Sequence, residues 1–341
     1  MTVRELGEYP LVERLCRRLE KTFGIDPRVI VGAGDDAAVV DVNGVAVVLT
    51  VDAQLENVHF RRHWMPPAAL GWKALAVSLS DIAAMGARPL AALLAIALRG
   101  DEPIDFLDAF YDGATAICQA TGTLLVGGDI ARSPNGLLVT SMVVGIADDG
   151  AVWRRDGAQP GDALLLTGTV GDAAAGLWLL ENRHGGIAQV ADASAHCVRR
   201  FRFPEPRVRA REALKGFRVH AAIDLSDGLT IDAGRLAHAS KVAAVLNLNQ
   251  LPVSEALKAV AHATGQDPFP WAMGGGEDYE LLLAVPAHDA DAACAALRNH
   301  NIPARIVGTV ANDPKGAVLA AFPDGTRRPI TGGFQHFADG S

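Results

Sequence analysis

Hydrophobic and polar positions recur along the first half of the chain at the spacings typical of helices and strands. Apolar residues at helical spacing predict helices over 10–23, 66–85 and 105–120. Aliphatic and β-branched runs predict strands over 39–42, 45–51, 89–98, 124–126 and 137–146. Asn43-Gly44, between the first two strands, is a favoured two-residue hairpin turn. Strands packed against helices are therefore expected here.

The pattern starts again after Asp148-Asp149-Gly150, which we interpret as a linker. Strands are predicted over 163–167, 219–223, 242–248, 280–285 and 304–310. Helices are predicted over 172–182, 206–215, 228–239, 254–263 and 288–299. Because 341 residues exceed the usual size of one core, we expect an α/β (α+β) fold with two domains, 1–149 and 150–341.

Composition narrows the class of partner. No apolar run reaches the roughly 20 residues that span a bilayer, and no apolar leader precedes a cleavage site, so we expect a cytoplasmic protein without a membrane partner. The net charge is −8 and no basic cluster exceeds a short pair, which argues against nucleic acid. The four cysteines are far apart in sequence, so we interpret them as packing thiols.

Aspartates recur at strand ends, at glycine turns and within apolar helices. They are Asp36, Asp52, Asp81, Asp129, Asp224 and Asp227. Any one of them is explained as a helix cap or a turn residue. Asp81 is harder to explain in this way, because it interrupts an apolar helix where a charge needs a partner. Shared divalent cations are the economical partner for several such carboxylates, and a donor set made only of oxygen favours Mg²⁺.

Magnesium held by aspartates beside glycine turns is the arrangement that phosphoryl transfer needs. The stretch GAGDDAAVV (32–40) places Asp35-Asp36 between such a turn and an apolar strand. The sequence contains no G-x-x-x-x-G-K-[ST] loop and no protein-kinase motif set, so a nucleotide would be held by another scaffold. His59 and His63 stand four residues apart, but no third soft ligand supports a zinc site.

Eight segments in order and spacing resemble the thiamine-monophosphate kinase family, from the superfamily of aminoimidazole ribonucleotide synthetase. They are GAGDDAAVV (32–40), ENVHF (56–60), KALAVSLSDIAAMGA (73–87), GGD (127–129), RDGAQPGD (155–162), IDLSDGL (223–229), GGGEDYEL (274–281) and FQHF (334–337). The resemblance implies direct, Mg²⁺-dependent transfer of the γ-phosphoryl group of ATP to thiamine monophosphate, without a phosphoenzyme. It also implies a homodimer, whose N-terminal domains form a β-barrel-like interface beside C-terminal α/β domains.

The resemblance also implies roles for single residues. The metal ligands would be Asp36, Thr50, Asp52, Asp81, Asp129, Asp224 and Asp227. The contacts to ATP would be Tyr111, Gly128, Asp129, Arg155 and Ser226. The contacts to thiamine monophosphate would be His59, Glu277 and Phe334.

The chain departs from the family pattern at Val51, Ala53-Gln54, Ser78 and Ile130-Ala131. Val51 stands where threonine is usual, so a ligand there would have to be a backbone carbonyl, and Ile130-Ala131 replaces hydroxyl residues. These departures leave two alternatives open. One is another ATP-dependent synthetase of the same superfamily, and the other is a catalytically inactive, nucleotide-binding regulator.

Overall fold

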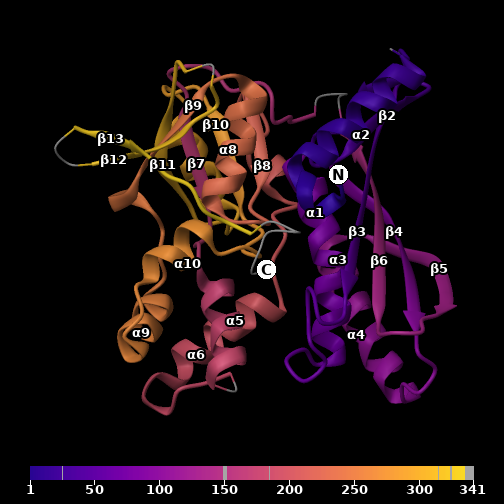
Figure 1. The fold of residues 1–341 in the computed structure, drawn as a ribbon. Coiled ribbons are helices and arrows are strands. Elements are labelled where there is room, and N and C mark those ends of the chain that lie inside the picture. Colours follow the sequence, from indigo (N-terminus) through magenta and orange to yellow (C-terminus); the bar gives the residue numbers. More distant parts are fainter. Residues whose placement is uncertain (25, 149–151, 184, 314, 323–324, 335–341) are drawn as a thin grey trace.

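The computed structural model describes residues 1–24, 26–148, 152–183, 185–313, 315–322 and 325–334. It contains two mixed β-sheets that stand side by side, one from each half of the chain (Figure 1). A group of helices from the second half lies beneath the sheet of that half and beside α3 of the first half. The predicted two-block α/β organisation is therefore present.

The N-terminal sheet has six strands in the order β1-β2-β3-β6-β4-β5. These are β1 (Val29–Val31), β2 (Ala38–Val42), β3 (Val45–Leu55), β4 (Arg88–Leu98), β5 (Leu124–Arg132) and β6 (Leu138–Ala147). Neighbours are antiparallel except β4 and β5, which are parallel because helix α4 (Ile104–Thr121) connects them. The strand β5 is an edge strand and every residue from Val126 to Arg132 is exposed.

Helix α3 (Pro67–Ala84) covers one face of this sheet, and α4 packs on α3. Almost every side chain of α3 is buried, which explains its uniformly apolar sequence. The two helices approach closely at Gly71 and Gly113, where an added Cβ would lie 1.8 Å from the carbonyl oxygens of Phe110 and Ala68, respectively. Both glycines are therefore required by helix packing.

The opposite face of the N-terminal sheet is open. Strand pairing aligns Val51 of β3 with Met142 of β6, and Met142 with Leu93 of β4. The exposed fractions of these three side chains are 64%, 38% and 38%. A row of apolar side chains thus runs across three strands with nothing in the described chain covering it.

The C-terminal sheet has seven strands in the order β13-β12-β9-β11-β7-β10-β8. They are β7 (Ala163–Thr167), β8 (Ala221–Asp224), β9 (Ala243–Asn247), β10 (Leu281–Val285), β11 (Ala304–Ala311), β12 (Val318–Ala321) and β13 (Arg327–Pro329). Alternate residues of β7 face opposite sides: Leu164 and Leu166 pack with α8 (Leu229–Ser240), whereas Leu165 packs with α7 (Ala210–Ala213) and α11 (Ala290–Asn299). Burial on both faces explains the continuous apolar strands.

A lower helical layer joins the two halves. It consists of α5 (Asp172–Arg183), α6 (Ala191–Arg202), α9 (Glu255–Thr264) and α10 (Pro268–Gly274), with the short 3₁₀ turns η2 (Ala188–Val190) and η3 (Leu248–Gln250) nearby. Side chains of α5, α6 and α9 belong to the same buried apolar cluster as those of α3 and α4. The halves of the chain therefore share one continuous core.

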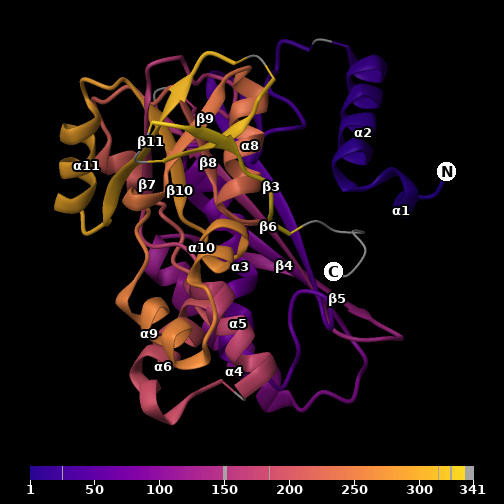
Figure 2. The same ribbon diagram turned by 60° about the vertical axis from the view of Figure 1, so that its left-hand side comes forward.

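Helices α1 (Val3–Leu6) and α2 (Glu8–Phe23) bury no residue and stand at the outer edge of the molecule (Figure 2). No helix of the described residues is long and apolar enough to cross a membrane. Three cysteines are buried as expected, whereas Cys16 of α2 is only half-buried. The predicted boundary between 149 and 150 lies outside the described residues and stays a prediction.

Several predicted elements need correction. The helix predicted over 206–215 is only the four-residue α7, because 204–207 run as an irregular segment. Strand β3 extends to Leu55 and β5 extends through Gly127-Gly128-Asp129, where we had expected a turn. The predictions omitted α1, α6, α10, β1, β12 and β13. Most of these are short elements, or helices whose polar residues hide the apolar period.

Candidate active site

Three of the predicted metal ligands meet between the two sheets. Asp36, Asp81 and Asp224 each offer a carboxylate oxygen, and these three oxygens all lie within 4.8 Å of one another. Asp36 lies in the loop before β2, Asp81 in the last turn of α3 and Asp224 at the end of β8. We call these three residues the acidic cluster. It gathers carboxylates from both halves of the chain at one point.

The acidic cluster is held by hydroxyl groups. Thr50 of β3 donates a 2.5 Å hydrogen bond to Asp81, and Ser80 of α3 donates one of 2.6 Å to Asp224. Asp52 lies beside the cluster and accepts a 2.8 Å hydrogen bond from Ser78. Thr50 and Asp52 face the cluster because residues two apart in a strand share a face, and Val51 faces the open side instead.

Burial of like charges destabilises the ionised form of this cluster. Burial raises the pKa of Asp81 well above its ordinary value, and the neighbouring Asp52, Asp224 and Asp36 raise it further. Burial, followed by the charge of Asp36, likewise raises the pKa of Asp224. Burial also raises the pKa of Asp52. The position of Asp81 at the negative end of the α3 dipole adds to this cost. A cation at this position would offset the repulsion between the carboxylates.

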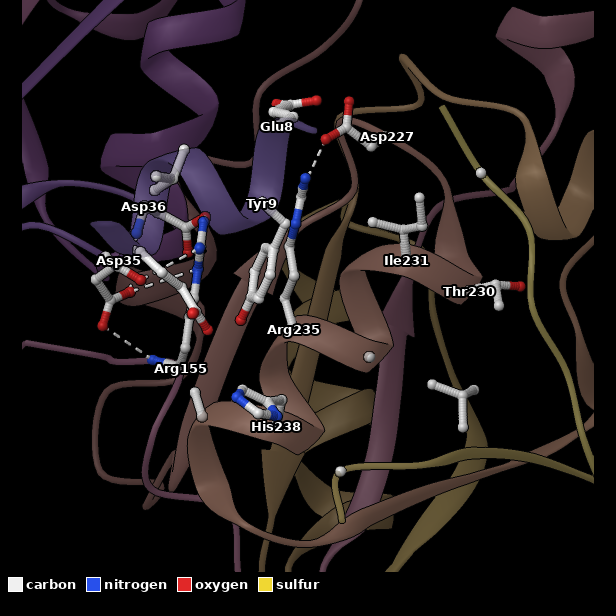
Figure 3. A pocket seen from close by; sticks show the side chains of 18 of the residues that line it. Glu8, Tyr9, Asp35, Asp36, Arg155, Asp227, Thr230, Ile231, Arg235 and His238 are labelled. Atoms are coloured by element: carbon white, nitrogen blue, oxygen red, sulfur yellow. Dashed lines mark hydrogen bonds and ion pairs between the residues drawn. The ribbon is translucent and has the colours of Figure 1, made fainter. Parts of the chain in front are cut away.

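Arg155 is the basic residue that reaches the cluster. Its guanidinium group forms an ion pair with Asp36, and its Nε lies 3.7 Å from Asp35 (Figure 3). Burial lowers the pKa of Arg155, but the adjacent Asp36 and Asp35 outweigh this effect and the net shift is upward. On the other side of Tyr9 in Figure 3, Arg235 forms a 2.6 Å ion pair with Asp227. Acidic residues and arginines are therefore paired on both sides of Tyr9.

The donor set fits a divalent metal. One oxygen of Asp36, Oδ2, is buried without a hydrogen-bond partner. The ligand atoms are carboxylate oxygens, which suit Mg²⁺ better than zinc, and the three acids are too close to stay ionised together without a counter-charge. Asp36, Asp81 and Asp224 would hold such an ion, with Asp52 and Thr50 next to them.

One cavity adjoins the acidic cluster, and a second cavity adjoins the first. The larger has a volume of about 1360 Å³ and is lined by residues that include Asp36, Asp81, Arg155 and Tyr9. The smaller has a volume of about 680 Å³ and is lined by residues that include His59, Ser226, Glu277 and Phe334. Asp52 and Asp227 line both cavities. Two bound molecules would thus meet at these carboxylates.

The smaller cavity brings together all three residues assigned to the substrate. His59 accepts a 3.1 Å hydrogen bond at Nδ1 from the backbone of Leu55, and the backbone of Phe334 donates a 3.0 Å bond to Asp227. Glu277 forms a 2.7 Å ion pair with Lys73. The three residues predicted to contact thiamine monophosphate therefore line one cavity.

Lys73 was not among the predicted site residues. It is fully buried in α3, and its ammonium nitrogen lies 3.7 Å from the centroid of the Phe201 ring. Burial lowers the pKa of this ammonium group, and the carboxylate of Glu277 opposes that shift. The reasoning applied to Asp81, that a charge within an apolar helix needs a partner, would have identified Lys73 as well.

The three glycines before Glu277, Gly274-Gly275-Gly276, line the smaller cavity and also allow close packing. A Cβ on Gly275 would lie 2.3 Å from that of Ala174, and one on Gly276 would lie 2.6 Å from the carbonyl oxygen of Ser226. They bring α10 close to α5 and to the loop after β8. Glu277 itself has a positive φ of 70°.

Three predicted contacts to ATP lie elsewhere. Asp129 and Gly128 are on the exposed edge strand β5, and Tyr111 is on α4 with 36% of its surface exposed. None of them lines either cavity. A Cβ on Gly128 would lie 1.7 Å from the carbonyl oxygen of Leu94, so strand pairing accounts for this glycine. Of the other two predicted contacts to ATP, Arg155 lines the larger cavity, whereas Ser226 lines only the smaller one.

Comparison with known proteins identifies the family. Residues 34–147 match the model of the AIR synthase related protein N-terminal domain, and 159–320 match that of its C-terminal domain. Thiamine-monophosphate kinase of Escherichia coli K12 is 37% identical over 338 residues, covering 97% of this chain and 98% of its own. This chain belongs to the thiamine-monophosphate kinase family.

Solved structures of the family share the fold. One, described as AaThiL complexed with AMPPCP and TMP, has a TM-score of 0.84 at 30% identity and covers 98% of this chain and 99% of its own. Thiamine-monophosphate kinase of Stenotrophomonas maltophilia has a TM-score of 0.75 at 35% identity and covers 93% and 96%. The expected two-domain fold of the aminoimidazole ribonucleotide synthetase type is therefore confirmed.

Proposed function

We propose that this member of the thiamine-monophosphate kinase family transfers the γ-phosphoryl group of ATP to the phosphate of thiamine monophosphate. The observation that carries the proposal is the junction of two cavities at Asp52 and Asp227, beside the acidic cluster. The AaThiL complex with AMPPCP and TMP supports two ligands on this fold. The larger cavity would take ATP and the smaller would take thiamine monophosphate.

The transfer breaks the bond between the γ-phosphorus and its bridging oxygen and forms one to a phosphate oxygen of thiamine monophosphate, releasing ADP. No group on the protein needs to carry the phosphoryl group, because the two cavities already meet. Magnesium, when bound, would offset the negative charge that develops on the phosphate oxygens. Asp36, Asp81 and Asp224 would hold it, with Asp52 and Asp227 at the junction.

The protein's own residues position the two anions. Arg155 lies against Asp36 at the wall of the larger cavity, where its planar guanidinium suits a phosphate oxygen. Ser226 lies in the smaller cavity next to Asp227. His59, Glu277 and Phe334 would fix the heteroaromatic part of thiamine monophosphate, so that its phosphate points to the junction.

The experiment incubates the pure protein with γ-labelled ATP, Mg²⁺ and thiamine monophosphate, and separates the products by chromatography. Label in thiamine diphosphate supports the proposal, and Asp291→Asn on the distant α11 is the matched control for changes at the cluster. Binding of ATP without any product would instead support the inactive regulator. Label transferred only to another acceptor would support a sibling synthetase.

We also propose that the working unit is a homodimer. The row Val51, Met142 and Leu93 is an apolar surface on an uncovered sheet face, which marks an interaction site. The exposed edge strand β5, with Gly128 and Asp129, belongs to the same sheet and would lie at the same interface. A second protomer would then bring its Asp129 and Tyr111 to the site that holds Arg155.

Mixing inactive variants tests the shared site. Asp129→Asn and Asp224→Asn are purified separately, mixed under conditions that exchange protomers, and assayed. If Asp129 acts in the partner's site, half of the dimers regain one intact site and the mixture recovers about a quarter of wild-type activity. No recovery despite verified exchange would show that both residues act within one chain.

A further inference from the structure

Three tryptophans line the smaller cavity without an assigned role, Trp64, Trp178 and Trp271, and the last two lie against each other. Trp178 lies on α5 and Trp271 on α10, and both rings border the cavity that contains Glu277 and Phe334. Their ring centroids are 5.8 Å apart with an interplanar angle of 57°. Neither residue lines the larger cavity. The pair therefore forms an aromatic wall on the side of the smaller cavity only.

Local structure fixes this pair in place. The carbonyl oxygen of Trp271 accepts a 3.0 Å hydrogen bond from Gly275, and that of Trp178 accepts one of 2.9 Å from the side chain of Asn182. The absence of a Cβ at Gly275 lets α10 end against Ala174 of α5. The same glycine turn leads to Glu277. It therefore positions both the tryptophan pair and the Glu277 carboxylate.

Packing alone does not explain Trp178. Its neighbours Leu179 and Leu180 are 0% and 6% exposed and fill the core, whereas Trp178 is only half-buried and turned to the cavity. Leu177 and Ala174, on the same helix, border the cavity as well. A large flat ring at a cavity wall offers area for stacking on an aromatic ligand at low entropic cost.

The position of the pair identifies the part of the ligand. Phosphoryl transfer would occur where the two cavities meet, and the residues that line both of them are Glu8, Asp52, Asp227 and Gly333. In thiamine monophosphate the phosphate is attached to the thiazolium ring through an ethyl chain, and the aminopyrimidine ring lies at the opposite end. Trp178 and Trp271 do not reach the larger cavity, so the distal ring is the one that meets them.

We propose that Trp178 and Trp271 form the binding wall for the aminopyrimidine ring of the acceptor, and so determine its specificity. The inference rests on the proposed function for the identity of the acceptor. Glu181 follows Trp178 by three residues on α5 and lines the same cavity, which places a carboxylate within the reach of an amino group on that ring. The wall binds and orients the acceptor and takes no part in the chemical step.

Binding of thiamine, which lacks the phosphate, tests the wall without ATP or metal. Thiamine should quench the intrinsic tryptophan fluorescence of the wild-type protein. Trp178→Leu and Trp271→Leu should each raise the dissociation constant for thiamine about tenfold, and Trp178→Phe and Trp271→Phe should raise it less. Trp72→Phe is the control, because Trp72 donates to the carbonyl of Pro204 and lines neither cavity. Circular dichroism verifies folding of each variant.

Fragments of the acceptor separate the two rings. 4-Amino-5-hydroxymethyl-2-methylpyrimidine should quench the wild-type fluorescence and lose affinity in both leucine variants, whereas hydroxyethylthiazole should not respond to either change. In turnover, the leucine variants should raise KM for thiamine monophosphate about tenfold, with kcat and KM for ATP nearly unchanged.

The outcomes distinguish this inference from the proposed function. The inference that Trp178 and Trp271 bind the acceptor would be wrong if both leucine variants bound thiamine within twofold of the wild type. It would also be wrong if the wild type did not bind thiamine. Response of the thiazole fragment instead of the pyrimidine would overturn the ring assignment. If the variants lost affinity for thiamine but the wild type formed no thiamine diphosphate, the role of the two tryptophans would be supported and the kinase proposal would be wrong.

Discussion

The acidic cluster and the edge strand β5 carry aspartates of the same predicted kind in opposite surroundings. Asp81 and Asp224 are enclosed by α3, β3 and β8 and held by hydroxyl groups from within the chain. Asp129 is exposed on an edge strand and lines neither cavity. In the proposed dimer, one chain would complete the metal-binding part of the site, and the β5 part would come from another protomer.

Removing a carboxylate from the cluster should have the largest effect. Asp81→Asn should reduce kcat about a thousandfold, because the acid that holds the charge-compensating ion is lost. Folding without Mg²⁺ should be unchanged or improved, since the change removes buried repulsion. Steady-state kinetics and thermal unfolding measure both. Near-normal turnover with a lower unfolding temperature would mean that Asp81 is structural.

A charge on the open sheet face should lower activity through the proposed dimer contact near β5, and not through the acidic cluster. Met142→Glu places a charge in the apolar row and should convert a dimer into monomers, with a loss of activity of about a hundredfold and an unchanged thiamine affinity. Size-exclusion chromatography with light scattering, together with kinetics, gives the result. A fully active monomer would show that β5 and the cluster work independently of a partner.

Within the region that one chain completes, Lys73→Met removes the cation beside Glu277. We expect KM for thiamine monophosphate to rise about tenfold with a small change in kcat, and stability to fall by about 1–3 kcal/mol. Lys73→Arg should restore part of the affinity, because it keeps the charge. An unchanged KM in Lys73→Met would mean that Lys73 does not position Glu277.

The pH dependence of stability tests whether Mg²⁺ binds at the acidic cluster. Since the folded state raises the pKa of Asp81 and Asp224, it binds more protons than the unfolded state above the ordinary carboxyl pKa of about 4. Stability without Mg²⁺ should therefore fall as pH rises through the raised pKa values. The gain in unfolding temperature on adding Mg²⁺ should be larger near pH 8 than near pH 5.5, because the ion replaces the protons. A gain independent of pH would contradict binding at the cluster.

The smallest effect is expected from a change at Val51, which lies between the acidic cluster and the open sheet face. Val51→Thr restores the usual family residue, yet its side chain lies on the open face and points away from Thr50 and Asp52. We expect changes in the Mg²⁺ requirement and in stability of no more than about 0.5 kcal/mol. A large drop in the Mg²⁺ concentration for half-maximal activity would show that a hydroxyl at this position reaches the metal.

Sequence reasoning was most successful where a local pattern and a buried environment agree. The strand over 163–167 was predicted to the residue, because its apolar run is packed on both faces. Asp81 was singled out because it interrupts an apolar helix, and it proved to be part of the cluster. Helix α6, in contrast, was missed: its polar and basic residues obscure the four buried side chains that hold it in the core.

The arrangement of the candidate site was only partly predictable. Spacing along the chain cannot show that Asp36, Asp81 and Asp224 meet, because strands and helices from both halves bring them together. Trp178 and Trp271 are 93 residues apart in sequence and become a pair only through the close contact of α5 and α10. Asp129 looked equivalent to the other aspartates, since no sequence pattern shows which strand is an edge.

Helix α3 has a mechanical consequence for the enzyme cycle. Within eight residues it contacts Glu277 through Lys73, Asp52 through Ser78 and Asp224 through Ser80. A rotation of one half of the molecule against the other would break the links to Glu277 and Asp224 together. Helix α2 and the chain near Gly333 border the cavities and could be displaced without breaking these links.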